Sequence, residues 1–166
     1  FYLISQTTTL VQGKKYFFRA EISSAGGTSN GVLNIYPGTA VAGSGILANH
    51  SFASSSSTKQ LIELQFTATQ ANVTLSLRHF RNPNANVTLS VHQLGFYLED
   101  DYLLQRDLND LFETLDLQNL KFDDLTAINN KITAIQNKLT NNPSLYTNDV
   151  KQYVEQGLTT AIAQKN

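Results

Sequence analysis

The 166-residue chain contains no cysteine, and few of its side chains are charged. Without cysteine, neither a disulfide framework nor a thiolate metal site can form. Charged residues make up 15% of the chain, against about 25% in a typical globular domain. Asparagine, threonine, serine and glutamine take their place, and such neutral polar surfaces recur in secreted proteins and on virus or phage exteriors. We therefore expect an extracellular protein or a component of a phage virion.

Long apolar runs and basic stripes are also missing. No apolar run approaches the ~20 residues that span a bilayer, and no signal peptide is visible. The first residue is Phe rather than Met, so we expect the chain to be a piece of a longer one. Residues 1–98 carry a net charge of +4 and residues 99–166 a net charge of −5, and neither half has the basic stripe that nucleic acid requires. We expect no membrane span and no nucleic-acid partner.

The first hundred residues have the hydrophobic rhythm of β-strands. Val73, Leu75 and Leu77 alternate with polar residues, which is the pattern of a half-buried strand. The strings Ala71–His79 and Ala85–Gln93 are nearly identical. Because no third copy appears, we interpret them as two similar strands and not as a solenoid repeat.

Several other segments show the same alternation, and polar or glycine-rich breaks separate them. Such a series of short strands predicts an antiparallel β-sandwich or jelly roll over residues 1–99. The apolar positions are Tyr16, Phe18, Ala20 and Ile22, then Leu33 and Ile35, then Ile62, Leu64 and Phe66, then Val87, Leu89 and Val91, and finally Leu94, Phe96 and Leu98. The breaks are Ser23–Gly31, Pro37–Gly45, Ser54–Thr58 and the turn Arg81–Asn84.

From Glu99 onward the apolar residues have helical spacing, so we predict that residues 100–166 form a second, helical region. An acidic run, Glu99–Asp101, suits the positive end of a helix dipole. A second helix is predicted from an N-cap at Asp123 to the break at Asn141–Pro143, and a third from Thr147 to about Gln164. The apolar stripes are Leu104, Leu108, Leu111 and Leu115, then Leu125, Ile128, Ile132, Ile135 and Leu139, and then Val150, Tyr153, Val154, Leu158 and Ile162.

The stripe over residues 125–139 is narrow, which suits a coiled-coil seam better than a helix docked on a broad sheet. Isoleucine at several of its positions favours three strands over two. We therefore predict that the residues of the first two stripes, Leu104 to Leu139, are a seam that joins copies of the chain, with a trimer favoured. The alternative is a small intramolecular helical hairpin packed on itself.

The string Ser5–Phe18 (SQTTTLVQGKKYFF) resembles the Q-x-x-x-L-x-x-G-K-x-Y segment of carbohydrate-binding-module-like jelly rolls. Those modules occur beside polysaccharide-degrading enzymes and in phage tail and fibre proteins. The resemblance implies a strand, a tight turn at Gly13 and a return strand with Tyr16 packed inward. Phe66–Thr69 and the closing strand Val87–Leu98 are similar to later parts of the family, so the likeness covers about residues 3–98.

Two features depart from the family. Its first strand, which carries a Trp before the Gln segment, has no counterpart here, so we expect part of the sandwich to lie upstream or to be supplied otherwise. The chain also has no Trp, the residue that many sugar-binding relatives use as a stacking platform. Tyr can take that role.

Catalytic constellations are not evident. Glu21 and Glu63 are the acids of the sandwich region, and nothing in the sequence places them as a glycosidase pair. His79 and His92 sit one register apart in the duplicated strings and should face opposite sides, which does not suit zinc. We expect no enzymatic activity, no metal and no cofactor.

A glycan, if bound, would lie on the face opposite the core. Sugars need an apolar ring platform with planar hydrogen-bonding groups around it. By strand parity we predict that the carbohydrate-binding residues are Tyr36, Arg78, Asn34, Gln65 and His92.

These observations favour a non-catalytic attachment or structural component of a phage tail or fibre. In this hypothesis the helices make the protein a homotrimer that contacts other virion proteins, and the jelly roll binds surface polysaccharide. The alternative is a carbohydrate-binding or adhesin module of a secreted bacterial protein.

Overall fold

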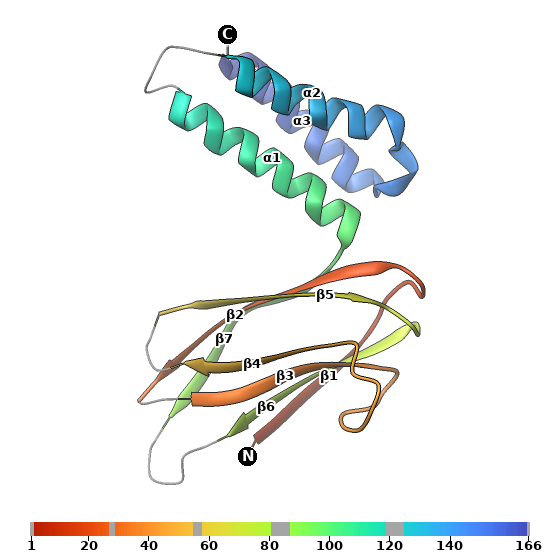
Figure 1. Cartoon of the computed structure of the whole chain (residues 1–166), viewed down its shortest axis with the longest axis vertical. Helices are drawn as coiled ribbons and strands as arrows, with labels where there is room; N and C mark the ends of the chain where they lie inside the picture. Colours follow the sequence, from red (N-terminus) through yellow and green to blue (C-terminus); the bar gives the residue numbers. More distant parts are fainter. Residues whose placement is uncertain (1, 27–28, 55–57, 81–86, 119–124, 166) are drawn as a thin grey trace. The chain divides into compact units, whose positions relative to one another are not determined.

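A computed structural model describes residues 2–26, 29–54, 58–80, 87–118 and 125–165. The chain divides into two compact units, Phe1–Leu98 and Glu99–Asn166. In the described residues, the first unit consists of seven strands in two antiparallel sheets, and the second contains three α-helices (Figure 1). The predicted fold class, an antiparallel β-sandwich followed by helices, is confirmed.

The sandwich has a four-stranded and a three-stranded sheet, in which every pair of neighbouring strands is antiparallel. The four-stranded sheet has the order β1 (Tyr2–Thr9), β6 (Asn72–Phe80), β3 (Ser29–Pro37), β4 (Ala48–Ser54). The three-stranded sheet has the order β5 (Gln60–Thr67), β2 (Lys15–Ala25), β7 (Thr88–Leu98).

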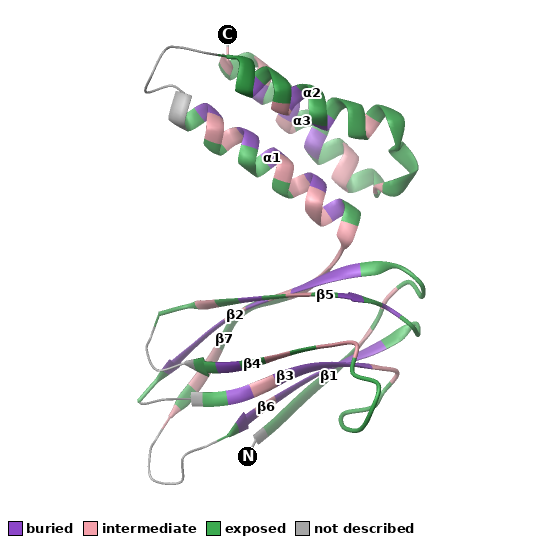
Figure 2. Cartoon of the chain, in the orientation of Figure 1, coloured by how far each residue is buried: buried purple, intermediate pink, exposed green. Residues whose placement is uncertain are grey.

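The core of the sandwich is formed by the alternating apolar residues that the sequence pattern indicates. Phe18, Ile35 and Val73 are fully buried, and they come from three different strands. Buried segments accordingly run along β2 and β6 in Figure 2. The core residues are Tyr16, Phe18, Ala20, Ile22, Leu33, Ile35, Phe52, Ile62, Phe66, Ala68, Val73, Leu75 and Leu77.

The turn at Gly13 connects the two sheets and does not close a hairpin. Gly13 has a positive φ of 83°, which glycine adopts at no steric cost. The strand before it, β1, pairs with β6, whereas the strand after it, β2, pairs with β5 and β7. Tyr16 packs inward as expected, and its phenol oxygen accepts a hydrogen bond from Val11 N at 2.9 Å.

The two alternating segments in residues 87–98 belong to one strand, β7, which has a bulge between them. Glu21 pairs with Gln93, but Ile22 pairs with Val91, so His92 is an extra residue in β7. A bulge of this kind changes the phase of the alternation by one residue. That is why Val91 and Leu94, three positions apart, both face the four-stranded sheet.

The second unit is a bundle of α1 (Glu99–Gln118), α2 (Thr126–Asn141) and α3 (Asn148–Lys165), with a 3₁₀ turn at Pro143–Leu145. The predicted N-cap of α2, Asp123, lies outside the described residues, as does the turn Arg81–Asn84. Leu125 occupies the N-cap position of α2, with no side-chain cap bond. No helix in the described ranges is long and apolar enough to cross a bilayer.

The apolar stripes of the three helices pack against one another inside this single unit, which corrects the prediction of a seam between chains. Leu139 is partly buried against the same cluster, and Leu125 remains 44% exposed. The intramolecular alternative is the arrangement observed, with three helices in place of two. The buried cluster consists of Leu104, Leu108, Leu111, Leu115, Ile128, Ile132, Ile135, Val154, Leu158 and Ala161.

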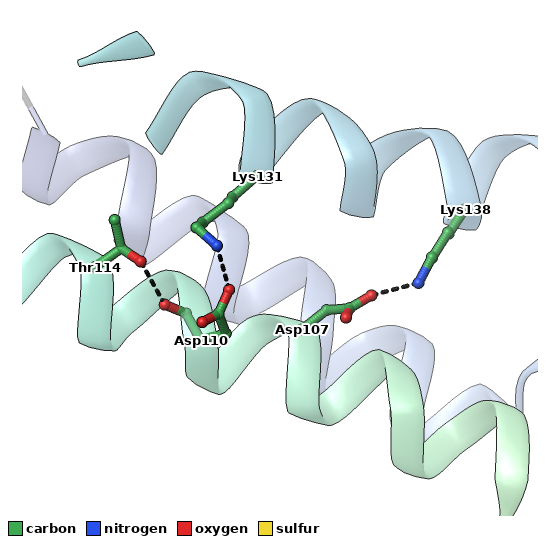
Figure 3. Close-up of polar contacts among 5 residues, drawn as sticks. All are labelled: Asp107, Asp110, Thr114, Lys131 and Lys138. Atoms are coloured by element: carbon green, nitrogen blue, oxygen red, sulfur yellow. Dashed lines mark hydrogen bonds and ion pairs between the residues drawn. The ribbon is translucent and has the colours of Figure 1, made fainter. Parts of the chain in front are cut away.

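Polar contacts connect the helices around this core. Lys131 pairs with Asp110 and Lys138 with Asp107, so two ion pairs join α1 and α2 (Figure 3). All four side chains are more than one third exposed, and exposed pairs contribute at most about 1 kcal/mol each. Apolar burial therefore accounts for most of the bundle's stability.

One carboxylate connects the first turn of α1 to the start of α3. Asp101 is buried and accepts hydrogen bonds from Thr147 N at 3.0 Å and Thr147 Oγ1 at 2.9 Å. Nearby, burial raises the pKa of the Tyr146 phenol above its usual value, while the Lys138 charge acts in the opposite direction.

Candidate functional site

The five predicted carbohydrate-binding residues lie on two different faces of the sandwich. Asn34, Tyr36 and Arg78 alternate with the core residues of β3 and β6, so they lie on the outer face of the four-stranded sheet. Gln65 lies on the outer face of the three-stranded sheet, opposite Phe17. His92 is hydrogen-bonded to Ser23 of that same sheet, at 2.6 Å. The structure therefore does not bring the five together.

Tyr36 and Asn34 are covered in this structure. Their exposed fractions are 2% and 6%, and Asn34 Nδ2 donates a hydrogen bond to the Tyr36 phenol oxygen at 3.2 Å. The segment that follows β3 lies over this face of the sheet. Its first part is attached to β6, since Thr74 Oγ1 donates a hydrogen bond to the Gly38 carbonyl oxygen at 2.7 Å. Tyr36 is thus not an exposed stacking ring.

The outer face of the three-stranded sheet carries a different set of ring and planar side chains. In the register of the sheet, Phe17 of β2 lies between Gln65 of β5 and Tyr97 of β7. In the next row, Arg19 lies between Glu63 and Gly95. We call the set Phe17, Arg19, Glu63, Gln65, Gly95 and Tyr97 the Tyr97 surface.

The Tyr97 ring lies flat along its own strand. A Cβ atom on Gly95 would lie 2.8 Å from Tyr97 Oη and 2.9 Å from its Cζ, so the ring occupies the space above Gly95. A side chain at position 95 would push the ring away from the sheet. Sequence reasoning missed Tyr97, although the alternation of Leu94, Phe96 and Leu98 already placed it on the outer face.

The side chains around Tyr97 include both positively and negatively charged groups. Arg19 Nη2 lies 3.6 Å from Glu21 Oε1, and Lys59 Nζ lies 3.9 Å from Glu21 Oε2. Within the part of the chain that the structure describes, the buried Nε of Arg19 has no hydrogen-bond partner. A buried donor without an acceptor is unfavourable, whereas the Arg19 side chain as a whole is 35% exposed and can present its other N–H groups to a ligand.

A shallow hollow extends this surface toward Lys15 and Thr67, which pair across β2 and β5. It has a volume of about 250 Å³, and Gln65 and Phe66 complete its lining. The hollow and the Tyr97 surface share Gln65. Together they offer the Tyr97 ring, the Arg19 guanidinium, the Lys15 ammonium, the Gln65 amide and the Thr67 hydroxyl to a ligand that follows the sheet.

The acidic and histidine side chains of the described residues do not form a metal-binding cluster. Glu21 is engaged with Arg19 and Lys59, and Glu63 lies one row away on β5. His79 faces the inside of the sandwich, on the four-stranded sheet, whereas His92 contacts Ser23 on the other sheet. Within the described ranges, no group of three or more His, Asp or Glu side chains gathers around one point.

Comparisons with known proteins identify similar folds. No family model and no curated protein matches the chain. Among solved structures, one titled "CBM4 structure and function" has a TM-score of 0.48 and 10% identity, covering 58% of this chain and 61% of that one. An "EclA C-terminal domain; sugar-binding protein" has a TM-score of 0.44 and 17% identity, covering 57% and 65%.

A third structure, "Carbohydrate-Binding Module CBM36 in complex with calcium and xylotriose", has a TM-score of 0.39 and 13% identity, covering 57% of this chain and 72% of that one. The chain spans less than two thirds of the length of the first two structures.

Proposed function

We propose that the sandwich unit is a non-catalytic glycan-binding module and that the Tyr97 surface is its binding site. The observation that supports this most directly is the Tyr97 ring, which lies over Gly95 beside Arg19. The apolar C–H face of a sugar ring stacks on a flat aromatic ring. Guanidinium, amide and carboxylate groups at its edges can hydrogen-bond to sugar hydroxyls.

The first prediction concerns Tyr97 itself. Replacing Tyr97 with Ala removes the ring, and we expect glycan affinity to fall by about tenfold or more, as for a central aromatic contact. Tyr97→Phe keeps the ring and should retain most of the affinity. The measurement is isothermal titration calorimetry of the full chain against soluble neutral and acidic polysaccharides.

Tyr153→Ala is the matched control, because this side chain is 55% exposed on α3 in the other unit. It should leave the affinity unchanged. Equal losses for the two alanine variants would contradict the Tyr97 site, and absence of binding to every polysaccharide would contradict the proposed function.

We further propose that this module is an attachment component of a phage tail or fibre, with the helical unit joining it to other virion proteins. The helical unit is compact and separate, and its described residues hold no cluster of metal-binding side chains, which supports a connecting role. The alternative is a carbohydrate-binding or adhesin module of a secreted bacterial protein. Both proposals place the protein outside the cell or on the virion surface.

The oligomeric state distinguishes these two settings. For the fibre, light scattering after size-exclusion chromatography should give three times the chain mass of 18.4 kDa. Because the leucine and isoleucine stripes are buried within one chain, such a trimer would use another surface. A monomer at high concentration would contradict the fibre proposal and leave the secreted module.

A further inference from the structure

The segment Thr39–Ile46, between β3 and β4, lies across the outer face of the four-stranded sheet, and we call it the strap. Ser76 Oγ donates a long hydrogen bond to the Val41 carbonyl oxygen of the strap, at 3.4 Å. The flanking residues are held more firmly. Each makes a backbone bond of 2.7 Å, from Gly38 N to Asn72 O and from Leu47 N to Ile35 O.

The side chains of the strap add little to its attachment. All eight of its residues are exposed, including Val41 at 36% and Ile46 at 40%. Gly43 and Gly45 have positive φ values of 115° and 86°, and no atom lies within 4 Å of a Cβ placed on either. Segments with few buried contacts open at a small fraction of the global unfolding free energy.

Beneath the strap the sheet presents a polar surface. Asn34, Tyr36, Thr74 and Ser76 are each at most 6% exposed, although they lie on the outer face. Their groups bond to one another or to neighbours; for example, Thr7 Oγ1 donates to Thr74 Oγ1 at 2.8 Å. Water or a ligand can replace such bonds, so uncovering these residues costs less than uncovering an apolar surface of the same size.

We infer that the strap opens as a unit and that the surface beneath it binds a hydroxyl-rich glycan. The inference rests on the proposed glycan-binding function and adds a second binding face to it. The four covered residues supply a phenol ring, an amide and two hydroxyls, and Arg78 is the next outward residue along β6 after Ser76. All of these groups can hydrogen-bond to sugar hydroxyls.

Thiol labelling of the full-length chain tests the opening directly, because the natural sequence has no cysteine. Ser76→Cys would place a thiol beneath the strap, where the residue is 0% exposed, and Ala20→Cys would place one in the core, where it is 2% exposed. Under native conditions we expect the thiol at position 76 to react roughly 100-fold faster, since only local opening exposes it. Equal rates would mean that the strap opens only when the sandwich unfolds, which would overturn the inference.

A reversible lock tests the link to binding. Ser76 Oγ contacts the Val41 carbonyl oxygen at 3.4 Å, so the lock is the pair Val41→Cys with Ser76→Cys, and mass spectrometry first establishes that the disulfide has formed. The probes are oligosaccharides of β-1,4-glucose, β-1,4-xylose and α-1,4-glucose. We expect the oxidised variant to bind at least one of them several-fold more weakly than the same protein after reduction.

The outcomes separate the two proposals. If the wild-type chain binds a probe and oxidation of the double variant changes nothing, the covered face is not a binding site, while the Tyr97 site stands. If the wild-type chain binds no glycan, the proposed function fails together with the ligand part of this inference. The labelling rates still decide whether the strap opens.

Discussion

Replacing Phe18 with Ala is expected to destabilise the sandwich by about 3–5 kcal/mol, the usual cost of removing a buried aromatic ring. Phe18 is 0% exposed, and its ring centroid lies 5.1 Å from that of Phe96. Phe96 in turn packs edge-to-face against Phe66, with centroids 5.8 Å apart. Because these rings come from all three strands of one sheet, the cavity would loosen β2, β5 and β7 together.

Urea unfolding followed by near-ultraviolet circular dichroism measures this change. The matched control is Phe80→Ala, since Phe80 is 50% exposed at the end of β6, and its replacement should cost less than about 1 kcal/mol. Similar losses for the two variants would show that the aromatic cluster is not the centre of the core. The helical signal of the second unit should not change in either variant.

Replacing Leu111 with Ala should destabilise the helical bundle by about 2–5 kcal/mol. Leu111 is 0% exposed and packs in the cluster shared by the three helices. Its loss leaves a cavity in this cluster. A unit of 68 residues has a small core, so we expect much of the bundle to unfold at room temperature.

Ellipticity at 222 nm against urea concentration gives the free energy of unfolding for this unit. Leu145→Ala provides the control, because Leu145 is 48% exposed in the 3₁₀ turn. A Leu111→Ala variant that kept its unfolding midpoint but lost mass in light scattering would restore the view that this stripe joins separate chains.

Most of the secondary structure follows from the periodicity of the apolar residues alone. The alternation around Phe18 and Ile62 correctly predicted two strands and the faces that they bury. The three-four spacing from Leu104 to Leu115 did the same for a helix. Both patterns are informative because one side of each element is buried and the other is exposed to solvent. The bulge at His92 also had a visible signal, the change of phase between Val91 and Leu94.

The candidate site could not be predicted from periodicity in the same way. Strand parity correctly put Tyr36 and Gln65 opposite the core, but a sandwich has two outer faces and parity does not say which strand belongs to which. The covering of Tyr36 depends on the path of a glycine-rich segment with no period of its own. Tyr97 became a candidate only when the register placed it beside Phe17, with its ring above Gly95.

The near-identical strings Ala71–His79 and Ala85–Gln93 show what the sequence determines and what depends on tertiary structure. Their alternation determined that each contributes a strand, and the later change to helical spacing determined that a second, helical unit follows. Only the tertiary structure decided that β6 is a central strand, buried from Val73 to Leu77, and that β7 is an edge strand with Val91 and Leu94 each 42% exposed. Local sequence controls backbone preference and the direction of each side chain, whereas burial depends on which distant segments pack on either side.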